Sequence, residues 1–512
     1  MPVLSDNKRI AKNTLFLYMR MLLVMAVTLY TSRVVLQALG VEDFGIYNVV
    51  GGVVAMLGFF NSSLANVTQR YINIGLGRNS REETERAFRQ SLTLMCLLSV
   101  FILIVGESLG LWFVCNKLVI PPDRLSAAVW VYQFSLISII SAIVQVPLMG
   151  SVVAHERMNM YAYLGLFEAF AKLGMVYFLQ LQLGIDELVL YGLLMAVISL
   201  LTWSFYAIYC RRNFSECRFK FYWNRPLVVD MSKFISQNLF GCFAWSAGIQ
   251  GSNIILNLFF GPVVNASRAI SVQVNTVVAR FTENIMTAVK PPIIKSYVTG
   301  DMGYMISLIE RSSKYAFFLA AVLAFPIMAE IEFILHLWLG QVPDYAPEFT
   351  RLVLCESLVG TFIPSLWIAA NATGKIMKNQ VYGRLFTLAI LPLSYLFLKI
   401  DANPIIPFAI AILANVGYWL YSLYDIHKQI HLSIRHYAFS VVRPSLLLSA
   451  VMTIVGAALL WLMPNGSFSR FVIVVSVMIV AALVTIYCML DSGEKKVVKG
   501  VLRKVCKMKE TE

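Results

Sequence analysis

Residues 14–37 read TLFLYMRMLLVMAVTLYTSRVVLQ, an apolar run interrupted by only two arginines. A helix that crosses a bilayer needs about 20 mostly apolar residues, so this run predicts a membrane span. It is longer than the apolar region of a secretory signal peptide, and it lacks a small-residue cleavage site. We therefore expect an uncleaved first span.

The whole chain has a composition that suits lipid. Its 512 residues are 59% hydrophobic and only 14% charged. Soluble proteins are about 45–50% apolar and about 25% charged. A soluble domain of this composition would expose large apolar patches and aggregate. The composition therefore excludes a soluble enzyme, a disordered protein and a fibrous protein.

Apolar runs of similar length recur along the chain, separated by polar or turn-rich breaks. They predict an all-α polytopic membrane protein with about 14 transmembrane helices. The second, seventh and eighth runs are the least apolar, because they are rich in Asn, Gln and Ser. The runs cover residues 14–37, 45–68, 90–114, 126–150, 160–181, 187–209, 235–258, 263–289, 315–335, 350–371, 379–398, 404–426, 442–463 and 470–490.

The basic residues predict an orientation. An even number of spans places both termini on one side, and both termini are basic. With cytoplasmic termini, 31 of the 42 Lys and Arg residues fall in cytoplasmic segments, 5 in outer segments and 6 within spans. This asymmetry follows the positive-inside rule. It explains most of the net charge of +14 without a nucleic-acid partner.

A weak internal repeat connects the first and second halves. Residues 32–40 lead through a turn into residues 45–48, and residues 252–261 lead through a similar glycine turn into residues 265–268. The offset of about 221 residues equals six spans, so the repeats are expected to be parallel.

The repeat predicts two six-helix lobes followed by an extra helix pair. Paired six-span bundles that rock about a central cavity are typical of transporters. A structural membrane protein with two similar halves is the alternative. The predicted parts are an N-terminal lobe, a basic cytoplasmic linker, a C-terminal lobe, helices 13–14 and a basic cytoplasmic tail, at residues 1–210, 211–234, 235–430, 431–490 and 491–512.

Two of the in-span cations lie far from a span end. A charge at the bilayer centre costs about 2.5–3.5 kcal/mol on insertion scales, so such residues face a cavity, pair or snorkel. Lys172 is near the middle of its span, with Glu168 four residues before it, and Arg280 has Glu283 three residues after it. We expect Lys172 and Arg280 to face a cavity, which favours an anionic substrate such as a phosphate or diphosphate. The other in-span cations are Arg20, Arg33, Arg268 and Arg384, and the last three can snorkel.

Other polar residues give weaker signals. Amides and hydroxyls concentrate in spans 1, 2, 7 and 8, where they indicate either a wet cavity or contacts between helices. The sequence contains no C-x-x-C pair, P-loop, G-x-S-x-G or H-E-x-x-H motif. We therefore expect no metal site, no cofactor and no enzymatic activity.

At this point the sequence resembles a known family. The first span with Arg20 and Arg33, the turn at residues 39–47, the sequence Gln69-Arg70-Tyr71 and the mixed-charge loop at residues 77–86 carry the resemblance. They resemble the polysaccharide-unit flippases (O-antigen and capsule type) of the multidrug/oligosaccharidyl-lipid/polysaccharide exporter superfamily. The local match covers residues 10–95, and the plan of fourteen spans extends it over most of the chain.

The resemblance implies a flippase of the bacterial inner membrane whose two lobes form a V. Its substrate would be an oligosaccharide on undecaprenyl diphosphate, moved to the periplasmic leaflet by alternating access for lipopolysaccharide, capsule or exopolysaccharide assembly. A proton or sodium gradient would drive transport, with Glu168 or Glu283 in ion coupling or charge balance. Arg20, Arg33, Lys172 and Arg280 would hold the diphosphate. Polymerase and assembly proteins would be its partners.

Three other functions stay open from the sequence. A lipid II flippase would also need cavity cations and fourteen spans. A drug–ion antiporter would need a more acidic cavity and usually has twelve spans. A polytopic glycosyltransferase or polymerase usually carries large outer loops or a D-x-D motif, whereas the longest predicted outer loop is residues 336–349.

Overall fold

A computed structural model describes residues 2–78, 80–155, 157–181, 184–463, 467–490 and 494–495. Within these ranges the regular structure is helical throughout, and twelve helical segments are long and apolar enough to cross a membrane. The chain is a multi-pass, all-α membrane protein, as the sequence predicts. Of the predicted basic tail at residues 491–512, only Glu494 and Lys495 belong to the described residues.

The exact number of fourteen spans is not confirmed. Helix α1 (Pro2–Met56) continues past a kink at Gly40 and through a short 3-10 turn into α2 (Phe60–Gly77). The segment Met21–Phe59 therefore counts as one long apolar stretch, although it overlaps both of the first two predicted spans. The predicted eighth span lies in α9 (Pro262–Val298), which is helical but too polar to count among the twelve.

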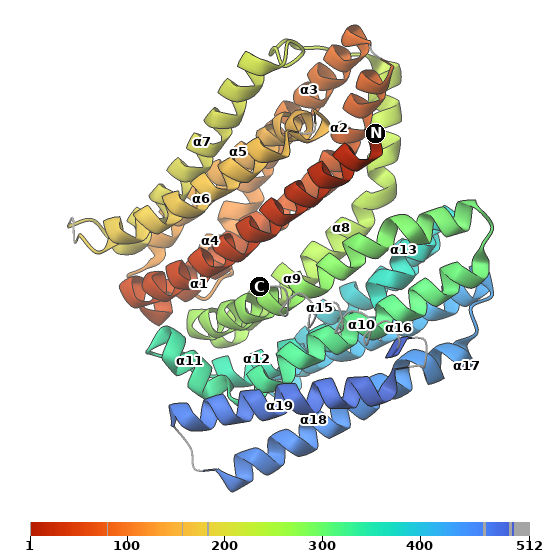
Figure 1. Cartoon of the computed structure of the whole chain (residues 1–512). Helices are drawn as coiled ribbons and strands as arrows, with labels where there is room; N and C mark the ends of the chain where they lie inside the picture. The colour runs from red at the N-terminus through yellow and green to blue at the C-terminus, as the bar shows by residue number, and fades with distance from the viewer. Residues whose placement is uncertain are drawn as a thin grey trace, which may run out of the picture. The chain divides into compact units, whose positions relative to one another are not determined.

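The chain divides into two compact units that interleave along the sequence. Unit 1 comprises Met1–Ile270, Gln341–Ala346 and Arg384–Ile410. In it α5 packs against α7, α2 and α3, α6 packs against α1 and α7, and α15 packs against α8 (Figure 1). Its further helices are α3 (Arg81–Val105), α4 (Leu111–Asn116), α5 (Leu125–Ala154), α6 (Met158–Leu179), α7 (Glu187–Asn213), α8 (Arg225–Phe260) and α15 (Arg384–Ile400).

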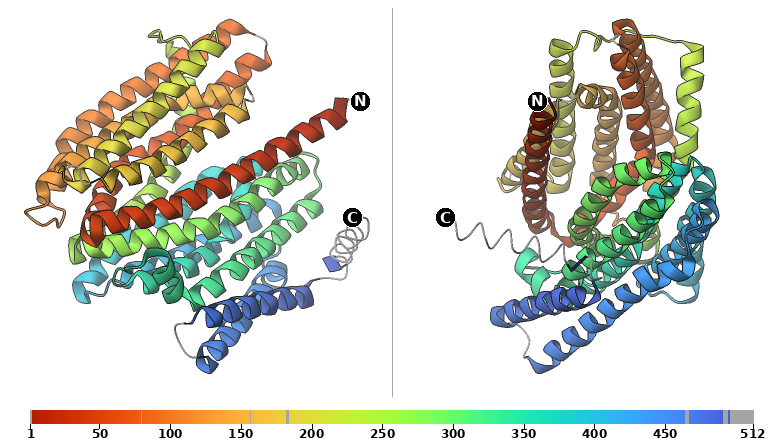
Figure 2. Two further views of the ribbon diagram at one scale, coloured as in Figure 1. Left: turned by 60° about the vertical axis from the view of Figure 1, so that its left-hand side comes forward. Right: turned by 45° about the vertical axis from the view of Figure 1, so that its right-hand side comes forward.

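Unit 2 comprises Ser271–Gly340, Pro347–Gly383 and Ala411–Glu512. Its core forms where the alanine-rich face of α10 packs against α13, α18 and α19. Helices α18 and α19 lie side by side in every view (Figure 2) and correspond to the predicted extra pair. The helices are the rest of α9, then α10 (Met302–Ala329), α11 (Ile331–Leu339), α12 (Ala346–Gly360), α13 (Ile363–Thr373), α14 (Ile376–Lys378), α16 (Ile406–Ile430), α17 (Ile434–Tyr437), α18 (Arg443–Leu462) and α19 (Phe468–Met489). The lobe boundaries predicted from the sequence stay predictions.

The internal repeat appears in the backbone. Gly40 has φ 74° and ψ 173°, and Gly261 has φ 76° and ψ −171°. This region of backbone space is open essentially to glycine alone. Each glycine joins two helical segments, and they stand at the offset of about 221 residues seen in the sequence.

Candidate functional site

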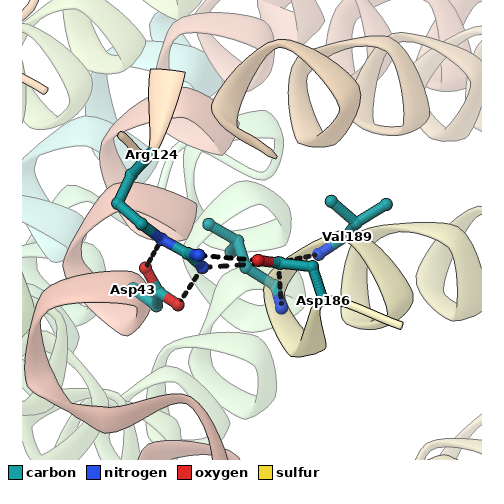
Figure 3. Close-up of polar contacts among 5 residues, drawn as sticks. Asp43, Arg124, Asp186 and Val189 are labelled. Carbon is teal, nitrogen blue, oxygen red and sulfur yellow. Dashed lines mark hydrogen bonds and ion pairs between the residues drawn. The ribbon is translucent and has the colours of Figure 1, made fainter. Parts of the chain in front are cut away.

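One arginine ties together three segments of unit 1 that are distant in the sequence. Arg124, at the start of α5, donates from Nε to Asp43 Oδ1 at 2.8 Å and from Nη1 to Asp186 Oδ2 at 2.6 Å (Figure 3). Asp186 also caps α7, since it accepts the N–H groups of Leu188 and Val189. Partial burial alone would raise the pKa of Asp186, but Arg124 and these N–H groups hold it below its usual value. The cluster fixes the part of α1 just after its kink at Gly40 to the starts of α5 and α7.

This cluster places the turn after Gly40, the connection before α5 and the connection before α7 at one end of unit 1. All three belong to the segments that the charge pattern assigns to the outer side of the membrane. Sequence reasoning did not select Arg124, Asp43 or Asp186 as site residues. Arg124 stands 81 positions after Asp43 and 62 positions before Asp186, and no local motif connects the three residues.

Lys172 forms an ion pair within α6. Its Nζ donates to Glu168 Oε1 at 2.7 Å, and the two side chains are 34% and 44% exposed. The acid lies one turn N-terminal to the base, which is the better order for an i, i+4 pair. The pairing that the sequence suggested is therefore present, and it keeps a cation and an anion together in an apolar span.

Helix α6 lies beside the first limb of α1, where two other predicted cations are found. The two helices pack against each other, the side chains of Tyr30 of α1 and Tyr177 of α6 interact, and both helices run toward the end held by Arg124. At 1.5 Å per residue, Lys172 lies about 7.5 Å before Tyr177 along the helix axis, and Arg33 lies about 4.5 Å beyond Tyr30. Arg33 is half-buried. The two cations therefore lie on neighbouring helices at different depths.

Arg20 lies on the same limb of α1, but its side chain is outside the described part of the chain. Arg280 and Glu283 lie on the part of α9 that belongs to unit 2, and both side chains are exposed. Within the described ranges these two residues form no ion pair with each other, so the i, i+3 pair suggested by the sequence is not present. The structure thus brings together Lys172 and Glu168, with Arg33 on the next helix, and it places Arg280 in another unit.

The amides at the α8–α9 junction connect helices. Asn253 donates to the carbonyl of Asn48, and Asn265 donates to Asn253 Oδ1 at 2.7 Å. Asn257 bonds both the N–H and the C=O of Val119. The three asparagines of α8 and α9 are at most 5% exposed. The sequence allowed such amides either to line a wet cavity or to make contacts between helices. These three buried amides make packing contacts.

Metal ligands do not gather in the described ranges, where no group of three or more His, Cys, Asp or Glu side chains could hold an ion. Where α1 and α6 lie side by side, Arg33 and Lys172 can bind anionic groups.

Solved structures share this fold. The lipid II flippase MurJ, in an inward closed conformation, matches with a TM-score of 0.67 at 12% identity, over 92% of this chain and 98% of that chain. A multidrug resistance MATE family transporter of the MOP superfamily, in an inward-facing conformation, matches with a TM-score of 0.65 at 13% identity, over 79% of this chain and 94% of that one.

A third match is a MOP superfamily transporter from Pyrococcus furiosus that has a binding pocket of reverse polarity. Its TM-score is 0.58 at 13% identity, over 82% of this chain and 96% of that chain. The sequence itself matches no family model and no curated protein. The chain therefore has the MATE/MurJ-like fold.

Proposed function

We propose that this protein is a flippase for undecaprenyl-diphosphate-linked oligosaccharide units. It would move them from the cytoplasmic to the periplasmic leaflet of the bacterial inner membrane, for lipopolysaccharide O-antigen, capsule or exopolysaccharide assembly. Both termini would be cytoplasmic. Transport would proceed by alternating access through a cationic central cavity, driven by a proton or sodium gradient. The protein would hydrolyse nothing itself.

The observation that carries this proposal is the Lys172–Glu168 pair inside an apolar span of a MATE/MurJ-like fold. Charged residues in a membrane span are costly, and they mark substrate or ion pathways by default. A purely structural helix at this place would bury Leu or Ala instead. Arg20, Arg33 and Arg280 would join Lys172 in holding the diphosphate, with Glu168 and Glu283 in charge balance or ion coupling.

The extent of the structural matches supports a lipid-linked substrate. The lipid II flippase covers 92% of this chain, whereas the MATE structures cover 79–82% in most matches. If the chain has the fourteen spans that its sequence predicts, the C-terminal pair α18–α19 would be additional to the twelve spans that a drug exporter usually has. The alternative functions, in descending order, are lipid II flippase, multidrug/ion antiporter and polytopic glycan polymerase.

The test is deletion of the coding sequence followed by a leaflet-resolved assay of lipid-linked oligosaccharide. The proposal expects the intermediate to accumulate on the cytoplasmic face and surface polysaccharide to disappear, with recovery on complementation. Normal surface polysaccharide without this accumulation would contradict the proposal. Accumulation of the peptidoglycan precursor instead would favour the lipid II alternative, and drug sensitivity alone would favour the antiporter.

A further inference from the structure

A charged cavity lies within unit 2, at the end where α10 and α17 begin and α19 ends. Its volume is about 540 Å³, and we call it the Lys314 cavity. The charge pattern assigns this end of the helices to the cytoplasmic side. Its lining includes none of the cations of the proposed transport path.

Lys314 is a buried charge of this cavity. Its side chain is 8% exposed, and its Nζ donates to both carboxylate oxygens of Glu494 at 2.9 and 3.1 Å. The hydroxyl of Tyr315 donates to the same carboxylate at 2.5 Å. Glu494 is equally buried and comes from the segment after α19, 180 positions away. A buried ammonium needs an anion, and the chain supplies one from its own C-terminal segment.

The cavity holds further groups that suit an anion. Arg311 lines it, is exposed, and makes no ion pair within the described part of the chain. Ser440 also lines it and has a buried hydroxyl without a hydrogen-bond partner among the described residues. The second acid, Glu310, is already bonded to His436 Nδ1 at 2.8 Å. With Glu494 withdrawn, Arg311, Lys314 and the Tyr315 hydroxyl would be left for another oxyanion.

The remaining wall of the cavity is apolar. Ile306, Phe439, Pro444 and Met489 line it beside the cations. A phosphate suits Arg and Lys donors, and an acyl chain suits an apolar wall. Basic pockets between transmembrane helices at the cytoplasmic side are typical sites for lipid head groups.

We propose that the Lys314 cavity is a phosphate-binding site for the head group of an anionic phospholipid. The Glu494 carboxylate takes the place of the phosphate as an intramolecular competitor. Glu494 is therefore paired with Lys314 when the lipid is absent, and its carboxylate gives way to the phosphate when the lipid binds.

The test measures lipid binding to the purified full-length protein by native mass spectrometry, so it does not depend on transport. Dioctanoyl phosphatidic acid is the probe, and dioctanoyl phosphatidylcholine is the control lipid. Glu494→Gln removes the competing charge. We expect it to tighten phosphatidic acid binding about tenfold, the value of one hydrogen bond to a charged group. The triple variant R311Q/K314Q/E494Q should bind phosphatidic acid no better than phosphatidylcholine.

The triple variant leaves no buried charge unpaired at this place, so it is expected to fold, and its melting temperature checks this. Arg351→Gln is the matched control, because Arg351 is an exposed cation of unit 2 paired with exposed Glu332. Equal binding of the two lipids by wild type and Glu494→Gln would overturn the proposal, as would unchanged binding in the triple variant. Displacement of the lipid by millimolar inorganic phosphate would overturn the lipid assignment in favour of a soluble phosphate.

Discussion

Gly45 of α1 lies directly against the main chain of Pro262 at the start of α9. A Cβ atom at residue 45 would stand 1.9 Å from the carbonyl oxygen of Pro262. The two residues follow the glycine turns at Gly40 and Gly261, so the two copies of the internal repeat touch through backbone within unit 1. Hydrogen bonds from Asn253 to Asn48 and from Asn265 to Asn253 hold the same contact.

This contact predicts a large effect of one methyl group. Gly45→Ala must push α1 and α9 apart, because the obstructing atom belongs to the backbone and cannot rotate away. We expect it to lower stability by about 1–3 kcal/mol, as overpacking does in a close-packed interior. Gly51→Ala on the same limb of α1 is the control, since nothing lies within 4 Å of its added Cβ. Thermal unfolding in detergent measures both variants, and equal melting temperatures would refute the close approach.

The fold class could be predicted because lipid imposes simple rules. A spanning segment must satisfy its own backbone hydrogen bonds, so an apolar run of about 20 residues in a chain of this kind becomes a helix. Residues 14–37 lie within α1, and all but the last of residues 470–490 lie within α19. The rule does not decide whether α9 counts as a span, because Arg280 and Glu283 make this helix less apolar. It also cannot separate two spans joined by a single kink such as Gly40.

The candidate site could be predicted only where its geometry is local. Lys172 and Glu168 meet because one helical turn brings them together, which the sequence shows directly. The Arg124 cluster and the Lys314–Glu494 pair join residues 62 to 180 positions apart. Such pairs depend on how helices pack, and composition or spacing carries no signal for them.

The buried pair between Arg470 and Glu330 gives a second prediction. Arg470 Nε donates to Glu330 Oε1 at 2.8 Å, with side chains 8% and 6% exposed. It joins the start of α19 to the end of α10. Arg470→Met leaves a buried carboxylate without its cation, which typically costs about 3–5 kcal/mol.

The companion variant R470M/E330Q removes both charges and should recover much of this loss. Arg351→Met breaks the exposed pair with Glu332 and should cost at most about 1 kcal/mol. Melting temperatures of the three proteins decide the matter. If Arg470→Met and Arg351→Met have the same melting temperature, the Arg470–Glu330 pair does not hold α19 on α10.

The His155–Glu216 pair gives a prediction of pH dependence. Its atoms Nε2 and Oε1 are 3.0 Å apart, at the end of α5 and in the segment after α7. The adjacent Glu216 carboxylate raises the pKa of His155 above its usual 6.5, although partial burial opposes this. Burial alone would raise the pKa of Glu216, but the adjacent His155 ring holds it below its usual 4.5.

The signs of these shifts define a window. The raised pKa of His155 stabilises the fold below pH 6.5, and this contribution is lost as the pH rises through the raised value. The lowered pKa of Glu216 stabilises the fold above pH 4.5, and this contribution is lost as the pH falls through the lowered value. The melting-temperature difference between wild type and Glu216→Gln should therefore be largest between pH 4.5 and 6.5 and shrink on the alkaline side. A difference independent of pH would show that the pair is uncharged.

The Lys172–Glu168 pair allows structural and transport roles to be separated. Lys172→Met leaves Glu168 without its cation in an apolar span, so loss of transport in this variant alone has two explanations. The double variant K172M/E168Q removes both charges and the cost of an unpaired carboxylate. If Lys172 holds the diphosphate, the double variant should stay inactive at normal expression, whereas Lys172→Arg should keep most of the activity because it keeps the positive charge. Surface polysaccharide in a deletion strain that carries each variant is the measurement. Recovery of transport in the double variant would assign Lys172 only to neutralising Glu168, and the binding role would then pass to Arg20, Arg33 and Arg280.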